Sequence, residues 1–167
     1  MSTGPLNLAG ADLKGFDPID SGTYNATVFN VELKETKGGE DAKLPAGTPM
    51  WNVQFRISQE PYENRRVFRQ FVIAPAVVDG KPYEHKAKMD GILVRFLMAI
   101  GYSQDEITSG DFNPSFEDMA GRECRVVVRK YYNSFKGDGD EDKTPNDNEV
   151  TGVKPVAVGE TAGAGIQ

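Results

Sequence analysis

The stretch from Met50 to Gln59 alternates apolar and polar residues, and this period of two constrains the fold more than any other feature of the sequence. Its apolar residues share one parity: Trp51, Val53, Phe55 and Ile57. Successive side chains of a β-strand point to opposite faces, so the pattern predicts a strand with one buried and one polar face. We therefore expect a domain built on a sheet.

The segment Gly22–Thr36 is also rich in β-branched and aromatic residues, but its apolar parity changes between Val28 and Phe29. One extra residue in a strand exchanges its two faces, which is what a β-bulge does. The sequence thus predicts a bulged and strongly bent first strand. Three more segments have strand character: Arg65–Ile73, Arg122–Tyr132 and Glu149–Val156.

Between the third and fourth of these strands the period changes. From Met89 to Ile100, apolar residues recur at the spacing of one helical face, and Gly101 follows where a helix end favours a left-handed residue. A second, short helix is predicted with Asn113 as its N-cap and Gly121 at its end.

The order of three strands, a helix and two strands is that of the five-stranded Greek-key barrel called the OB-fold. Sandwiches and other small barrels have similar strand counts and stay open as alternatives. We expect a flexible N-terminal arm over residues 1–21, the OB-fold domain over 22–156 and a flexible Gly/Ala-rich tail over 157–167.

The net charge of −6 is concentrated at the two ends of the chain. Residues 1–21 carry −2 and residues 136–167 carry −4, so the centre is neutral and local clusters decide what it binds. We expect a soluble protein with no membrane association, because there is no signal peptide and the most apolar stretch is too short to span a bilayer.

The chain has one histidine, His85, and one cysteine, Cys124, so the usual Cys/His zinc sites cannot be assembled. Cys124 alternates with valines, and we expect it to be buried. No phosphate-binding loop or dinucleotide motif occurs. We expect neither a cofactor nor a catalytic site.

Two segments of the chain weakly resemble metal-binding motifs. A calcium-loop pattern over residues 138–149 has Lys143 where the motif needs glycine, so an acidic loop is expected. The triplet Glu32-x-Lys34, with Asp17 and Asp20 upstream, resembles metal-dependent nucleases. Such triplets occur seven times in the chain, and a nuclease is kept only as a minor alternative.

Basic and aromatic residues are interleaved on two of the expected strands. Proteins that bind single-stranded nucleic acid need cations along the backbone and flat rings for the bases. The candidate binding residues are Arg56, Arg65, Arg66, Phe68, Arg69, Arg125, Arg129, Lys130, Tyr131 and Phe135. Parity places Arg125, Arg129 and Tyr131 together on one face, whereas Tyr132 falls with Cys124 on the core face.

Several short motifs resemble one known family. They include Gly22-x-Tyr24, the turn Pro61–Arg65, the helix end Ala99-Ile100-Gly101, and Phe116–Met119 followed by Gly121. This pattern is similar to the OB-fold single-stranded-DNA-binding proteins of tailed bacteriophages, long filed as a domain of unknown function. The resemblance covers roughly Gly22 to Pro155 and includes no catalytic motif.

The resemblance implies a protein that coats single-stranded DNA during phage replication or recombination, in the cytoplasm of the bacterial host, with phage replication or recombination proteins as partners. Many proteins with this function end in an acidic tail, whereas residues 159–167 contain a single acid. A phage structural or interaction protein that uses the same small barrel is the main alternative.

Overall fold

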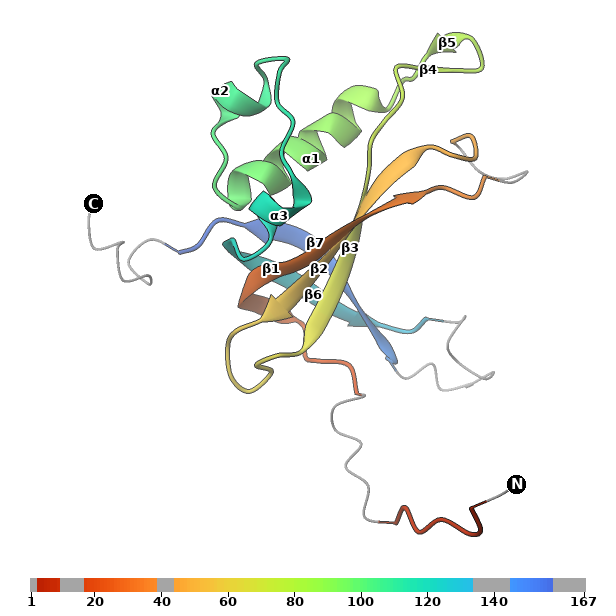
Figure 1. Cartoon of the computed structure of the whole chain (residues 1–167), viewed down its shortest axis with the longest axis vertical. Coiled ribbons are helices and arrows are strands. Elements are labelled where there is room, and N and C mark those ends of the chain that lie inside the picture. Colours follow the sequence, from red (N-terminus) through yellow and green to blue (C-terminus); the bar gives the residue numbers. More distant parts are fainter. Residues whose placement is uncertain (1–2, 10–16, 39–43, 134–144, 158–167) are drawn as a thin grey trace.

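The structure is a computed structural model that describes residues 3–9, 17–38, 44–133 and 145–157. Its main sheet has five strands, and two very short strands form a separate hairpin (Figure 1). The main strands are β1 (Gly22–Glu35), β2 (Pro49–Ile57), β3 (Arg66–Val72), β6 (Glu123–Tyr131) and β7 (Asp147–Lys154). The prediction of a mainly β protein with five principal strands is confirmed.

All neighbouring strands of the main sheet are antiparallel, in the order β3-β2-β1-β6-β7. The register of β1 against β2 shifts between Val28 and Asn30, so the predicted bulge is confirmed. Val28 and Val31 are both buried, while Phe29 and Asn30 between them are exposed. The extra residue therefore brings Val31 into the core in place of Asn30, and Phe29 lies on the outer face of the sheet.

The sheet curves around an apolar core, but it is not closed. The two edge strands, β3 and β7, contact each other without joining in a ladder in the part of the chain that the structure describes. The sequence predicted a closed barrel, and the structure shows an open sheet instead. A physical reason is visible at this edge: Arg69 occupies an inward-facing position of β3, opposite Val53, and its charge is costly to bury without a partner.

Helix α1 (Lys86–Ala99) lies between β3 and β6 in sequence, as predicted, and the helices gather at one end of the twisted sheet (Figure 1). Its Phe96 ring stacks on Phe71 at 4.5 Å between centroids and meets Phe55 edge-on at 6.0 Å. The helix ends at Ala99, and Gly101, two residues later, has a left-handed φ of 108°, as expected after a helix end. Aromatic packing thus fixes α1 over the inner face of the sheet.

Two short helices follow: α2 (Gln104–Ile107) and α3 (Phe116–Met119). The prediction that Asn113 caps the latter is wrong, because the Asp118 backbone N–H donates to Ser115 Oγ at 3.0 Å and Ser115 is extended. Asparagine and serine are both good caps, so composition alone does not choose between them. No described helix is long and apolar enough to cross a membrane.

The hairpin of β4 (Val77–Val78) and β5 (Lys81–Pro82) was not predicted. Its two turn residues, Asp79 and Gly80, have φ values of 53° and 79°. Positive φ at both positions is typical of a tight hairpin turn, and Asp-Gly is a strong signal for it. The dipeptide could therefore have revealed this element.

The core contains the predicted inward residues of the strands. Val53, Phe55 and Ile57 of β2 are completely buried. Val126 of β6 is also completely buried, and Cys124 is 1% exposed. The core also reaches upstream of Gly22, where the domain was expected to begin. Ile19 is 1% exposed, and its backbone N–H donates to Asn148 Oδ1 at 2.9 Å.

Candidate nucleic-acid interface

The outer surface of β1, β2 and β3 carries polar and charged side chains together with two exposed rings, Phe29 and Phe68. Cross-strand pairing places Arg56 beside Arg66, and Gln54 beside Phe68. Both arginines are exposed, and Phe68 is 48% exposed. We call the four residues Phe29, Arg56, Arg66 and Phe68 the β2–β3 face.

Phe29 organises the cations of this face. It is 38% exposed, and the guanidinium carbons of Arg66 and Arg56 lie 4.0 and 5.6 Å from its ring centroid. Cation–π attraction therefore holds both guanidinium groups over the first strand. Phe68, by contrast, makes no ring–ring or cation–π contact within the described ranges, so its ring is open to a ligand.

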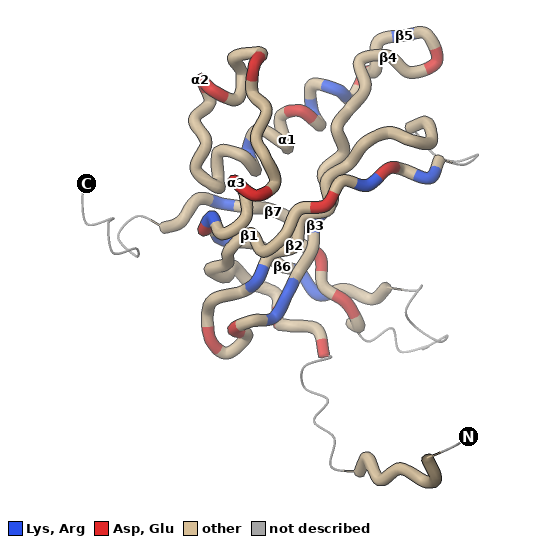
Figure 2. The backbone as a smooth tube through the Cα atoms, in the orientation of Figure 1, with Lys and Arg blue, Asp and Glu red and all other residues tan. Residues whose placement is uncertain are grey.

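The charges of the β2–β3 face are not neutralised. Among the described residues, neither Arg56 nor Arg66 forms a salt bridge. Figure 2 shows Lys/Arg segments side by side on β2 and β3. The nearest acid on this surface of β1 is Glu32, which accepts a hydrogen bond from Asn30 Nδ2 at 3.3 Å. Unpaired guanidinium groups beside an exposed ring suit a ligand with phosphates and bases.

The second predicted cluster lies on the opposite side of β1. Arg125, Arg129 and Tyr131 share the outer face of β6, as parity predicted, with the core residues on the other face. Arg129 Nε donates to the Glu149 carboxylate at 2.6 Å, and its Nη2 contacts the same oxygen. We call Arg125, Arg129, Tyr131 and Glu149 the β6–β7 face.

The other polar groups near this face are engaged as well. Lys130 Nζ lies 3.1 Å from Asp20 Oδ1, and the hydrogen bond from this lysine lowers the pKa of the carboxyl. Tyr131 O–H donates to Asp147 Oδ2 at 3.4 Å, and Arg125 Nε donates to the Pro155 carbonyl at 2.9 Å. The cations of β6 therefore already have acceptors within the protein.

The remaining candidates fall in different places. Arg65 Nη2 donates to the Asp17 carbonyl oxygen. Arg69 faces inward at the open edge of the sheet. Phe135 lies outside the described residues. Tyr132, predicted to join the core, lies just beyond β6 and is half-buried.

Sequence reasoning missed Phe29. The parity change between Val28 and Phe29 predicted the bulge but grouped this ring with Val31 on the inner face. The register shift falls between Val28 and Asn30, and the ring is exposed. The sequence also did not predict that the candidate binding residues lie on two separate surfaces.

The geometry of the described residues does not support either of the weak metal motifs. In the ranges that the structure describes, no three His, Cys, Asp or Glu side chains are grouped so that they could hold a metal ion. Most of the calcium-loop pattern lies outside those ranges. Cys124 is buried, and burial raises the pKa of its thiol to about 12, so it is not a nucleophile near neutral pH.

Comparison with known proteins gives a family but no activity. No curated protein matches the sequence. The model of the family described as "Protein of unknown function (DUF669)" matches residues 6–162, almost the whole chain, and the chain therefore belongs to this family.

Proposed function

We propose that the chain is a sequence-tolerant single-stranded-DNA-binding protein and that the β2–β3 face is its binding surface. One observation carries the proposal: an open ring, Phe68, lies on a polar sheet surface beside two guanidinium groups, Arg56 and Arg66, that have no salt bridge among the described residues. Cations for the backbone and a ring for a base are the two requirements of such a site.

The topology supports an OB-fold reading of the sheet. The strand order β3-β2-β1-β6-β7, the contact of β7 with β3 and the position of α1 between β3 and β6 agree with that fold. In OB-folds, the surface of the second and third strands is the one that binds oligonucleotides. The β2–β3 face occupies that surface.

The chemistry explains why binding is expected to tolerate many sequences. Phe68 stacks on a base, and every base has a π-face. Arg56 and Arg66 bind phosphates while Phe29 keeps their guanidinium groups over the sheet. Lys34, exposed on the same side of β1, adds a third cation. This arrangement positions a strand without reading its sequence.

The biological setting follows from the resemblance to phage proteins. We propose that the chain acts in phage DNA replication or recombination in the bacterial cytoplasm, together with other proteins of those processes. The proposal assigns it no catalytic step.

A fluorescence-anisotropy titration with labelled oligo-dT in EDTA tests the function. We expect binding without metal, weaker binding of duplex DNA, and a log–log salt slope of about −2 for three cations at ~0.7 each. Cleavage of the oligonucleotide once magnesium is added would favour a nuclease. No binding, or binding that salt does not weaken, would favour a structural or interaction protein and reject the proposal.

A further inference from the structure

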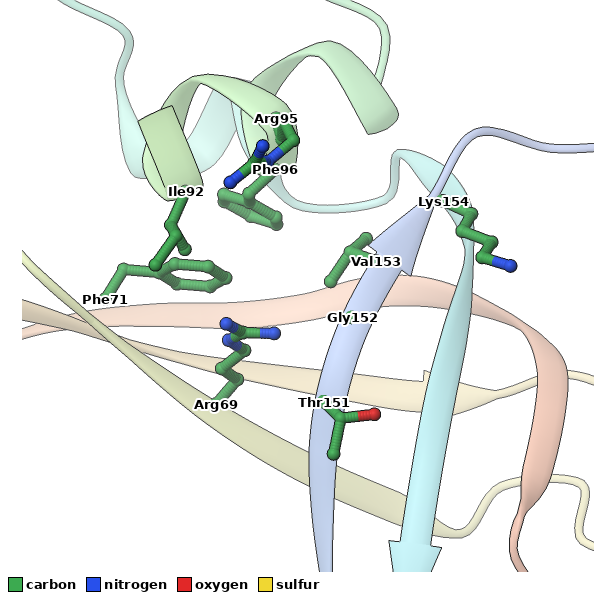
Figure 3. Close-up of a pocket in the computed structure, with 9 residues that line it drawn as sticks. All are labelled: Arg69, Phe71, Ile92, Arg95, Phe96, Thr151, Gly152, Val153 and Lys154. Atoms are coloured by element: carbon green, nitrogen blue, oxygen red, sulfur yellow. The ribbon is translucent and has the colours of Figure 1, made fainter. Parts of the chain in front are cut away.

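A cleft of about 360 Å³ lies where the sheet fails to close, between β3, β7 and α1. It is separate from the β2–β3 face, because its residues belong to the inward side of β3. Figure 3 shows the residues that line it: Arg69, Phe71, Ile92, Arg95, Phe96, Thr151, Gly152, Val153 and Lys154.

Arg69 is the unusual residue of this cleft. It is half-buried at a position of β3 whose neighbours, Val67 and Phe71, are core residues. Burial lowers the pKa of its guanidinium, and the negative charge of Glu149 opposes this effect. Within the described ranges its side chain has no salt bridge, and its guanidinium carbon lies 5.1 Å from the centroid of the Phe71 ring. The lining residues offer its five N–H donors no carboxylate, and their one side-chain oxygen is the Thr151 hydroxyl.

A second guanidinium approaches from the other wall. In Figure 3 Arg69 comes from β3 and Arg95 from α1, with the Phe71 and Phe96 rings between their side chains in this view, and Lys154 of β7 lies to one side. Among the nine lining residues there is no acid, and the nearby Glu149 is engaged by Arg129. Three cationic side chains around one partly buried space, with no acid among the lining residues, favour an anion there.

We propose that this cleft is a phosphate-binding site in which Arg69 and Arg95 hold a phosphate group from two sides. The planar guanidinium fork matches phosphate oxygens, and the cleft has room for a group larger than a single phosphate. The site does not require the proposed function. The phosphate is either that of a small molecule or a backbone phosphate of a strand that leaves the β2–β3 face over the free edge of β3.

Calorimetric titration of the full chain with pyrophosphate, without DNA, tests the site. We expect saturable binding, about tenfold weaker in Arg95→Gln and in Arg69→Met, since each variant removes a charged donor. Lys88→Gln is the matched control, because Lys88 is an exposed cation of the same helix that does not line the cleft. A melting curve checks that each variant folds, and Arg95 is exposed enough for its loss to leave the core intact.

Absence of saturable binding at millimolar pyrophosphate would overturn the proposal. So would an equal loss in Lys88→Gln and Arg95→Gln, which would mean that overall charge alone attracts the anion. A repeat at saturating oligo-dT identifies the source of the phosphate. Competition supports a backbone phosphate, and unchanged binding supports a small phosphorylated molecule. Pyrophosphate binding by a chain that does not bind oligo-dT would reject the proposed function and leave this site standing.

Discussion

The β2–β3 face and the β6–β7 face have the same ingredients, arginines next to rings on the outside of a strand, but they differ in what surrounds the charges. Arg129 is held by Glu149, and Tyr131 by Asp147. Arg66 has no salt bridge among the described residues, and its guanidinium carbon lies 4.0 Å from the centroid of the Phe29 ring. An arginine that already pairs with a carboxylate is less available to a phosphate. On this criterion the β2–β3 face can bind a phosphate, and the β6–β7 face is largely neutralised.

The largest effect is expected from the open ring of the β2–β3 face. Phe68→Ala should weaken binding of oligo-dT by about 1–3 kcal/mol through lost stacking, with little change in melting temperature because the ring is half exposed. Tyr131→Ala is the matched control on the β6–β7 face. Anisotropy titrations of both variants decide the point, and a larger loss in Tyr131→Ala would reverse the assignment of the two faces.

A smaller effect is expected from the cations. Arg66→Ala should reduce the magnitude of the log–log salt slope by about 0.7, since one phosphate contact is lost. Arg129→Ala should leave the slope nearly unchanged, because its charge is already paired with Glu149. Affinities measured over a range of salt concentrations give both slopes. Equal changes in the two variants would show that the pairing of Arg129 does not matter.

Removing the salt bridge between Arg129 and Glu149 tests whether this pairing is what separates the two faces. Glu149→Gln removes the carboxylate that holds this arginine and adds one unit of positive charge to the β6–β7 face. We expect a modest gain in DNA affinity at low salt, below about 1 kcal/mol, as for an exposed charge. Titration at low and moderate salt measures it. A loss of affinity would mean that the carboxylate positions a group that binds DNA.

No effect at all is expected from thiol reagents on the inner side of β6. Cys124 is 1% exposed and burial raises its pKa to about 12, so the folded protein should not be alkylated at pH 8. Mass spectrometry after treatment, with and without denaturant, checks this. Rapid alkylation of the folded protein would contradict the assignment of the inner and outer faces of β6.

Much of the fold could be predicted because it is encoded locally. The alternation around Phe55 defines β2, the parity change at Val28 defines the bulge, and the spacing before Gly101 defines α1. The N-cap of α3 could not be chosen, because Asn113 and Ser115 are equally good local candidates and only backbone geometry distinguishes them.

The candidate site was less predictable, because it depends on contacts between distant segments. Nothing near Arg129 in sequence shows that Glu149, 20 residues later, will neutralise it, since this requires the register of β6 against β7. Arg69 is the reverse case. Its parity with Val67 and Phe71 already marked it as inward-facing, so it could have been separated from Arg66 on the sequence alone.

The central claim is that single-stranded DNA lies on the β2–β3 face, and photo-cross-linking tests it most directly. Oligo-dT in which bromodeoxyuridine replaces thymidine is bound to the full chain, irradiated, and the attached peptides are identified by mass spectrometry. We predict attachment at Phe68, with Phe29 as a secondary site, and loss of the main product in Phe68→Ala. Attachment at Tyr131, with none on β1 or β3, would contradict the claim.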